Sequence, residues 1–220
     1  MDGTHFSELF SAYAAGRLDP AFALMVETQS AIRADVRLSL ATGEALAGAL
    51  LEGEAPAGLS AGAVDRAMAA IDALEAEDAR ARTAAKLAGT AMDELLALPE
   101  PLREHALAAA GQRGWKGTAP GIRRMALVTG SELEVELYRI EPGARVPKHT
   151  HAGSEYTLCV SGGFSDETGS FGPGDLAVKG PDDTHTPVGD DGEVCFALAI
   201  RDGGLRFTGV MGVIQRLLGA

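Results

Sequence analysis

The chain has 220 residues, of which 46% are hydrophobic, 5% aromatic and 23% charged, and its formal net charge is −12. This length and apolar content are sufficient for one large or two small globular domains. A chain this acidic repels phosphate backbones, so we expect no direct binding to DNA or RNA. The same charge would suit a basic protein partner, although acidic surfaces also serve solubility alone.

The two cysteines, Cys159 and Cys195, lie inside apolar runs, which is typical of buried thiols in a reducing compartment. No apolar run approaches the roughly 18 residues of a transmembrane helix, and no apolar stretch follows a basic N-terminal segment. We therefore expect a cytoplasmic protein without a signal peptide or a membrane span.

The first half of the chain is rich in Ala and Leu and shows helical periodicity. We predict helices over residues 4–16, 20–36, 38–51 and 61–75, and a weaker helix or linker over 79–98. Asp19 and Pro20 form a favourable N-cap and first position for the second helix. An apolar stripe marks the fourth helix at Val64, Met68, Ile71 and Leu74. Periodicity leaves two interpretations open: a self-contained bundle, or an interaction domain whose apolar faces contact a partner.

The second half changes to a period of two, beginning near Arg123. Leu133, Val135 and Leu137 alternate with charged residues, which predicts a half-buried strand. Turns rich in Gly, Pro and Asp follow at short intervals, so we predict a sandwich or barrel of short strands. A closing helix is predicted from Met211, Ile214, Leu217 and Leu218.

The residues that can carry chemistry gather after Gly143. His149 and His151 are two residues apart, so on a strand both imidazoles project from the same face. Residues 152–154 allow a turn, after which Glu155 begins the next strand beside them. His185 can enter from a further strand. Three of the five histidines and one glutamate are therefore candidate ligands of one ion.

Imidazole and carboxylate donors together suit Zn, Fe, Mn, Ni or Cu. Four protein ligands leave two open positions on a six-coordinate ion, whereas they fill a tetrahedral Zn²⁺ site. The alternative is that these four are ordinary surface or core polar residues. Cys159 shares the inward face of the strand with Glu155 but lies roughly 13 Å further along it, so we exclude it as a ligand of the same ion. Cys159 and Cys195 are assigned to the core.

Two segments resemble the conserved motifs of cupins. Residues 143–162 match the first motif at every spacing, and residues 173–185 resemble the second, with Asp183 where a Gly is usual and one residue fewer. Further segments are similar to ChrR-type anti-sigma factors: residues 11–16, the helix after Pro20, and residues 98–103, 120–123, 164–168 and 185–188. This resemblance implies a helical domain that masks an extracytoplasmic-function sigma factor, followed by a cupin that senses an oxidative signal such as singlet oxygen. In that family both domains usually bind zinc.

The first domain departs from the family pattern. In the family, the zinc site of this domain consists of an early His followed by His-x₃-Cys-x₂-Cys. In this chain His5 matches the first ligand, but the later positions are Gln29, Arg33 and Val36. None of these three is a plausible zinc ligand beside His5. We therefore expect no zinc in the N-terminal domain. In the cupin we expect one divalent transition metal, first of all Zn, with Fe, Ni or Mn as alternatives.

The sequence thus predicts a multidomain α+β protein: an all-α helical bundle over residues 1–98, followed by a cupin (jelly-roll) β-barrel over residues 99–220. The leading hypothesis is an anti-sigma factor that binds its sigma factor through residues 1–98, which carry 15 acidic and 7 basic side chains. The rival is a cupin metalloenzyme, such as a dioxygenase or isomerase, that acts on a small organic substrate. A third hypothesis is metal storage. Homo-oligomer formation is left open.

Overall fold

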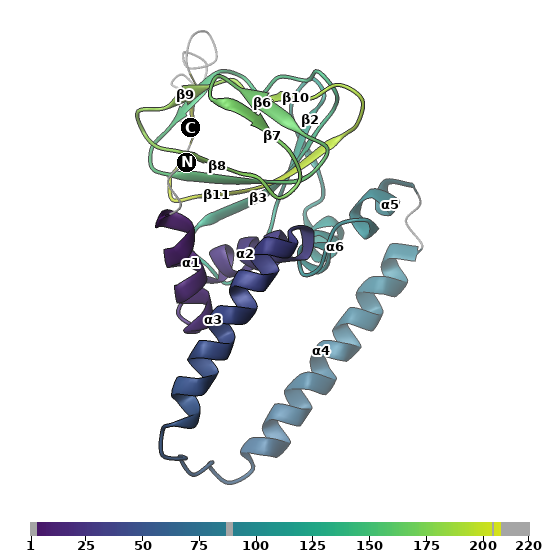
Figure 1. The fold of residues 1–220 in the computed structure, drawn as a ribbon. Helices are drawn as coiled ribbons and strands as arrows, with labels where there is room; N and C mark the ends of the chain where they lie inside the picture. The colour runs from purple at the N-terminus through teal and green to yellow at the C-terminus, as the bar shows by residue number, and fades with distance from the viewer. Residues whose placement is uncertain (1–3, 87–89, 204, 208–220) are drawn as a thin grey trace.

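The computed structural model describes residues 4–86, 90–203 and 205–207, with side chains for residues 8–75 and 92–203. A group of helices is followed by a β-barrel (Figure 1). The predicted fold class, a helical N-terminal region followed by a cupin barrel, is confirmed. The predicted closing helix lies outside the described residues.

In the described residues the helices that precede the barrel are α1 (Thr4–Ala14), α2 (Pro20–Ile32), α3 (Ala34–Glu52), α4 (Ala63–Lys86), α5 (Thr90–Leu96) and α6 (Leu102–Gln112). The predicted start of α2 is confirmed, since the Asp19 carboxylate accepts a hydrogen bond from the backbone of Ala21 at 2.8 Å and Pro20 opens the helix. Arg33 has extended backbone dihedrals and separates α2 from α3, so the predicted 20–36 helix was too long.

The strands are β1 (Lys116–Ala119), β2 (Ile122–Ala126), β3 (Glu134–Ile140), β4 (His149–His151), β5 (Glu155–Ser161), β6 (Phe164–Asp166), β7 (Gly169–Phe171), β8 (Leu176–Lys179), β9 (Thr184–His185), β10 (Val188–Gly189), β11 (Cys195–Arg201) and β12 (Leu205–Phe207). They form a six-stranded sheet in the order β1-β2-β3-β11-β5-β8. Two three-stranded sheets, β10-β6-β7 and β12-β4-β9, complete the barrel.

The central strands β3, β11 and β5 of the six-stranded sheet are largely buried on both faces. Its inner face meets β6 and β7 in a cluster formed by Ile122, Ile140, Cys159, Phe164, Phe171, Ala177, Cys195 and Ala197. Its outer face packs against α2, α5 and α6; in Figure 1, α2 and α6 lie below the barrel and α5 lies to its lower right. As a result Val135, Glu136 and Leu137 of β3 are all buried, so the prediction of a half-buried strand was wrong. The helices cover the apolar face of β3, whereas Glu136 and Tyr138 on the opposite face point into the barrel, where both contact Arg201. The period-two pattern of one strand does not reveal that the barrel encloses its polar face.

Helices and sheet share one hydrophobic core. The cluster joins Leu24, Leu95 and Leu102 of the helices to Leu137 and Leu198 of the sheet, and each of these side chains is at most 3% exposed. An ion pair between Arg139 on β3 and Glu94 on α5 joins the two parts at the rim, at 2.7 Å. The sequence-based boundary between residues 98 and 99 falls between α5 and α6, which both belong to this core. The division into two domains remains a prediction.

Two long helices leave the shared core. The ends of α3 and α4 extend away from the barrel and are joined by a loop at residues 53–62 (Figure 1). The helix predicted over residues 61–75 is the first part of α4, which continues to Lys86 through much of the stretch predicted as a weaker helix. Among the described helices, none has both the length and the hydropathy needed to cross a membrane.

The shared core leads to a prediction about cooperativity. Leu102→Ala, on the helical side, should lower the free energy of unfolding by about 2–5 kcal/mol because it leaves a cavity in the core. Circular dichroism at 222 nm and the fluorescence of Trp115, which packs against this core from the sheet side, should report the same shifted transition. Leu74→Ala, at a position 64% exposed, is the control and should change stability by no more than about 0.5 kcal/mol. Helices that melt separately while the Trp115 signal stays native would contradict one shared core.

Candidate metal centre

The four candidate ligands meet between the large sheet and a small one. His149 and His151 are on β4 and His185 is on β9, which pairs with β4 so that His149 and His185 are opposite each other. Glu155 opens β5 in the six-stranded sheet. All four side chains are buried, with exposed fractions of 2%, 1%, 3% and 6% for His149, His151, His185 and Glu155. Strand alternation and the turn at residues 152–154 therefore bring them together as the spacing predicted.

The donor atoms converge on one point. The Nε2 atom of His185 lies 3.0 Å from Nε2 of His149 and 3.1 Å from Nε2 of His151. The Glu155 carboxylate lies 4.0 Å from Nε2 of His185 and 3.7 Å from Nδ1 of His151. One ligand atom from each of the four residues falls within 4.8 Å of all the others. The group has the size of a single metal site.

The hydrogen bonds around the rings indicate which nitrogens face the site. Nδ1 of His149 lies 2.8 Å from the carbonyl oxygen of Pro147, which can only accept, and Nδ1 of His185 lies 2.8 Å from the Asp166 carboxylate. Both Nδ1 atoms therefore carry protons, and in neutral rings both Nε2 atoms present lone pairs to each other. Two lone pairs at 3.0 Å repel unless a cation lies between them. The buried His₃Glu group thus fits a single metal ion by its donor chemistry.

Burial keeps these imidazoles in the form that binds metals. It lowers the pKa of His149 to about 4, with His185 acting in the same direction, and it also lowers the pKa of His151. The rings of His149 and His151 are therefore neutral at neutral pH, the form in which an imidazole nitrogen can bind a metal. Nδ1 of His151 is buried without a hydrogen-bond partner.

Asp166 orients His185 from behind. Its fully buried carboxylate accepts from Nδ1 of His185 and forms an ion pair of 2.8 Å with Nζ of the buried Lys179. Burial alone would raise the pKa of Asp166, but hydrogen bonds from Lys179, Thr168 and His185 lower it well below its usual value. An ionised carboxylate behind an imidazole sets the tautomer and raises the basicity of the ligating nitrogen.

A second buried network supports Glu155. Arg201 is opposite Glu155 on the neighbouring strand β11, and its Nη1 lies 3.5 Å from the Glu155 carboxylate. The same guanidinium pairs with Glu136 and donates to the Tyr138 hydroxyl at 2.9 Å. Burial raises the pKa of Tyr138 to about 12, so the phenol stays protonated and donates to Glu136. Thr157 also donates to Glu155 at 3.2 Å. The glutamate is therefore held in place on two sides.

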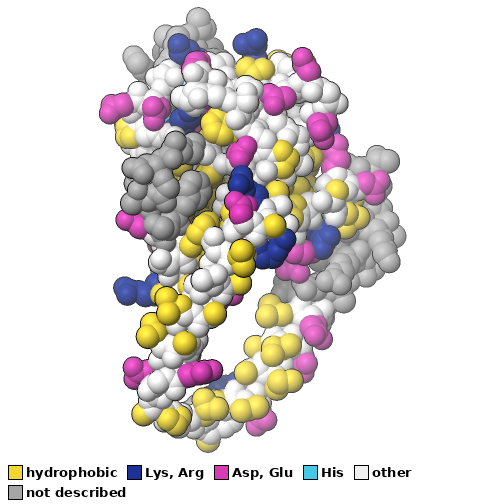
Figure 2. Space-filling view, in the orientation of Figure 1, with side chains coloured by type: hydrophobic (Ala, Val, Ile, Leu, Met, Phe, Trp, Pro, Cys, Tyr) yellow, Lys and Arg dark blue, Asp and Glu magenta, His cyan; other side chains and the backbone are white. Residues whose placement is uncertain are grey.

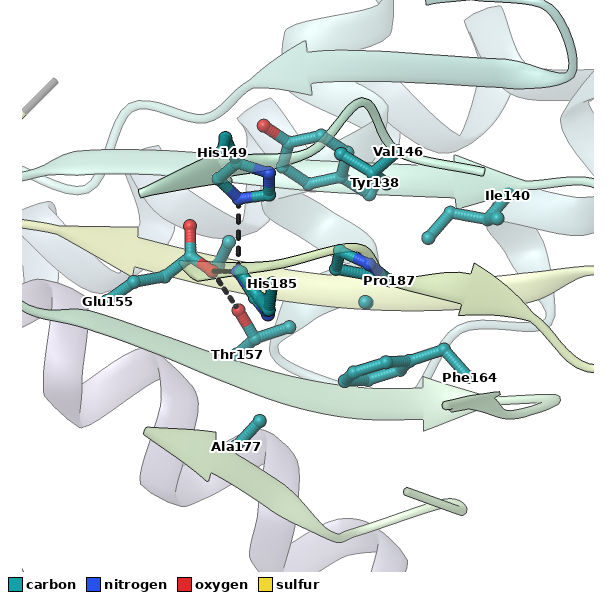
Figure 3. A pocket seen from close by; sticks show the side chains of 12 residues that line it. Tyr138, Ile140, Val146, His149, Glu155, Thr157, Phe164, Ala177, His185 and Pro187 are labelled. Atoms are coloured by element: carbon teal, nitrogen blue, oxygen red, sulfur yellow. Dashed lines mark hydrogen bonds and ion pairs between the residues drawn. The ribbon is translucent and has the colours of Figure 1, made fainter. Parts of the chain in front are cut away.

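A small cavity opens beside the ligands (Figure 3). It is lined at one end by His149, His185 and Glu155 and otherwise mainly by apolar side chains, among them Ile140, Val146 and Phe164. Its volume is about 40 Å³, and a single water needs roughly 10–15 Å³ on this measure. A molecule that approaches the site through this cavity must therefore be small.

The two cysteines lie in the core, as predicted. Both are fully buried in the inner-face cluster, and Cys159 is not part of the four-residue group. A hydrogen bond with Cys159, together with burial, raises the pKa of Cys195, so this group is a thiol rather than a thiolate.

The positions that depart from the family's first zinc site lie on α2 and α3. Gln29 is buried and donates from Nε2 to the carbonyl of Gly174 in the barrel at 2.9 Å. Arg33 pairs with Asp35 and with Asp175, and Val36 packs in a small core between α2 and α3. His5 lies in α1, and its side chain is outside the described residues.

Sequence reasoning did not find the supporting residues Asp166, Lys179, Glu136 and Arg201. Asp166 lies in a segment that carried the family resemblance, but spacing gave it no role. Arg201 had a usable signal, because a charged residue that ends the run Cys195–Arg201 of otherwise apolar, buried residues must find a buried partner.

The fold and the buried His₃Glu group define a cupin with a candidate metal site, preceded by a helical N-terminal region. The family model for the ChrR cupin-like domain matches residues 103–201. The anti-sigma-E factor ChrR of Cereibacter sphaeroides is 36% identical over 204 residues, which cover 92% of this chain and 91% of that protein. The chain belongs to the ChrR family of anti-sigma factors.

A solved structure agrees with this assignment. The crystal structure of Rhodobacter sphaeroides SigE in complex with the anti-sigma ChrR matches with a TM-score of 0.64 and 34% identity, over 89% of this chain and 96% of that one. The resemblance noted from sequence motifs is thus confirmed over both the helical and the cupin part of the chain.

The role of Asp166 can be tested through metal affinity. Asp166→Asn should weaken the affinity of the site for Zn²⁺ by about 10–100-fold, because the amide cannot polarise His185 as the carboxylate does. Competition with a chromogenic chelator measures the change. Asp191→Asn, an exposed change of the same chemistry, is the control. Equal affinities for both variants would show that Asp166 does not tune the site.

Proposed function

We propose that this chain is an anti-sigma factor that binds an extracytoplasmic-function sigma factor through its helices. We further propose that His149, His151, Glu155 and His185 hold one divalent transition metal, whose loss or rearrangement controls release of the sigma factor. The observation that carries the proposal is a large apolar surface on α3 and α4, of which α3 packs against α2, a helix of the core that is shared with the barrel.

The apolar surface lies on the two extended helices (Figure 2). It consists of Leu38, Leu46, Leu50 and Leu51 on α3, Leu59 in the loop, and Val64, Met68, Ile71 and Leu74 on α4. These side chains are 48–78% exposed, and Figure 2 shows apolar atoms on both helices facing the space between them. Exposed apolar patches of this kind mark interaction sites. The alternative of a self-contained bundle loses support, because these apolar side chains are left exposed by the part of the chain that the structure describes.

Charge and relatives favour a sigma factor as the occupant. Residues 34–75 carry seven acidic and two basic side chains, so the apolar surface has an acidic surround that suits a basic partner. The relative of known structure was crystallised in complex with the sigma factor SigE. An amphipathic helix pair with open apolar faces is a common way to bind another protein's helices.

The metal proposal rests on the donor set. The four buried ligand atoms, the lone pairs that face each other and the two supporting networks all favour a cation in the centre. Zn²⁺ fits the mixed imidazole and carboxylate donors, and Fe, Ni or Mn would fit them as well. Bound there, such an ion would supply a centre that an oxidant or small ligand can reach, and the small cavity limits what reaches it.

Binding of the sigma factor can be tested on the full chain. Met68→Glu combined with Ile71→Glu, at positions 53% and 48% exposed, should leave the fold intact. The affinity for the partner sigma factor should fall by at least about 30-fold, because loss of a central apolar contact costs about 2 kcal/mol or more. Co-purification and titration calorimetry measure it. Val128→Glu, on a 61% exposed residue of the barrel, is the control. Unchanged binding by the α4 variant would place the sigma factor elsewhere.

The metal centre can be tested by elemental analysis. The purified chain should hold about one transition metal, and replacement of His149, His151, Glu155 or His185 by Ala should remove it and lower barrel stability, because the remaining ligands lose their common partner. Cys159→Ser should retain the metal. Metal lost from the Cys159 variant, or kept by the ligand variants, would refute the assigned ligand set.

A further inference from the structure

Strand β5 has the candidate metal ligand on one side and a helix contact on the other. Glu155 faces the centre of the barrel, and the next residue, Tyr156, points the opposite way because successive side chains on a strand alternate. Its ring meets Phe22 of α2 edge-on, with ring centroids 4.9 Å apart and planes at 89°. Neighbouring residues on one strand thus contact the candidate metal centre and the helical part.

A second contact joins β5 to the end of α2. The turn at residues 172–175 is bonded to β5 in both directions: Gly174 N donates to Cys159 O at 2.8 Å, and Cys159 N donates to Asp175 O at 2.9 Å. The same turn accepts a hydrogen bond from the buried Gln29 and pairs with Arg33 at 3.2 Å. Helix α2 is therefore coupled to β5 at two places: directly at Tyr156, and through the turn at residues 172–175.

Gly174 allows this close approach. Its φ is +85°, and a Cβ added there would lie 2.4 Å from Cγ of Arg33 and 3.3 Å from Cγ2 of Ile32. Any side chain at this position would push the turn away from α2.

Arg33 is the joint between the two helices. It ends α2 and begins α3 with one extended residue, and it is the residue that pairs with Asp175 of the barrel. On its other side α2 packs against α3 through Val26, Val36 and Leu40. Helix α2 therefore lies between the strand that carries Glu155 and the helix that carries part of the apolar surface.

We propose that β5 and α2 form the mechanical link by which occupancy of the metal centre sets the position of α3. Without a cation the facing lone pairs of the histidines repel, and Glu155 loses its partner at the centre. The start of β5 then shifts, and Tyr156 and the turn at Gly174 carry the shift to α2 and the joint at Arg33. Two alternative packing arrangements between β5 and α2 would correspond to the states that bind and release the partner. The inference rests on the proposed function and adds the route of regulation.

Hydrogen exchange of the full chain tests the link without any sigma factor. In the wild-type protein, removal of Zn²⁺ with a chelator should increase amide exchange in peptides that cover residues 20–33. Gly174→Ala should keep its Zn²⁺ yet lose this metal-dependent difference, because α2 is already displaced from the turn. Gly130→Ala is the matched control: its φ is +77° and a Cβ there meets no atom within 4 Å, so it shares the backbone strain without the helix contact.

A second variant keeps the test valid if Gly174→Ala folds poorly. Arg33→Ala removes the pair with Asp175 at a half-exposed position, and it should reduce the metal-dependent difference while Arg66→Ala, on α4, leaves it unchanged. Identical exchange of residues 20–33 with and without Zn²⁺ in the wild type would overturn the link, as would a wild-type response in both Gly174→Ala and Arg33→Ala. A wild-type response to Zn²⁺ in a chain that binds no sigma factor would support the link and refute only the proposed partner.

Discussion

The burial of both faces of the central strands β3, β11 and β5 is the constraint on which the rest of the molecule depends. Each strand must divide its side chains between the barrel interior and the helical layer, and a shift by one residue would exchange them. On β5 this places Leu158 in the core shared with the helices and Cys159 in the barrel cluster. The same alternation places Glu155 at the candidate metal centre and Tyr156 against α2. A single register therefore positions the ligand and the helix contact together.

Charge compensation makes the centre tolerable inside the barrel. A carboxylate and three imidazoles buried together would be costly unless every charge had a partner. Arg201 provides one for Glu155 and Glu136, and Lys179 provides one for Asp166 behind His185. The two cations approach from the strands on either side of β5, since Arg201 and Lys179 are both opposite Glu155 in the register. The electrostatic support of the site is thus built from the same sheet that carries its glutamate.

The helical part is stabilised differently in its two regions. Near the barrel, α2, α5 and α6 bury their apolar residues against the sheet. Further out, α3 and α4 expose theirs, which is costly in water unless a partner covers them (Figure 2). Gln29, Arg33 and Val36 stand at the positions where the family resemblance implies zinc ligands. The Gln29 amide and the Arg33 guanidinium contact the turn at residues 172–175 of the barrel, and Val36 packs in a small apolar core. Gln29 and Arg33 thus join the helices to the barrel, and the absence of zinc there stays a prediction.

The amino-acid sequence alone determined which four residues form the candidate metal centre and the helix-to-barrel order. Both depend on local spacing: His149 and His151 two apart on a strand, a turn before Glu155, and Asp19 with Pro20 at a helix start. Only the tertiary structure decided what surrounds them. It enclosed the second face of β3. It also brought together residues 19 to 145 positions apart in the sequence: Asp166 with His185, Arg201 with Glu155, and Gln29 with Gly174. Periodicity reports which side of an element is apolar, but it contains no information about which distant element covers that side or which buried charge will be opposite.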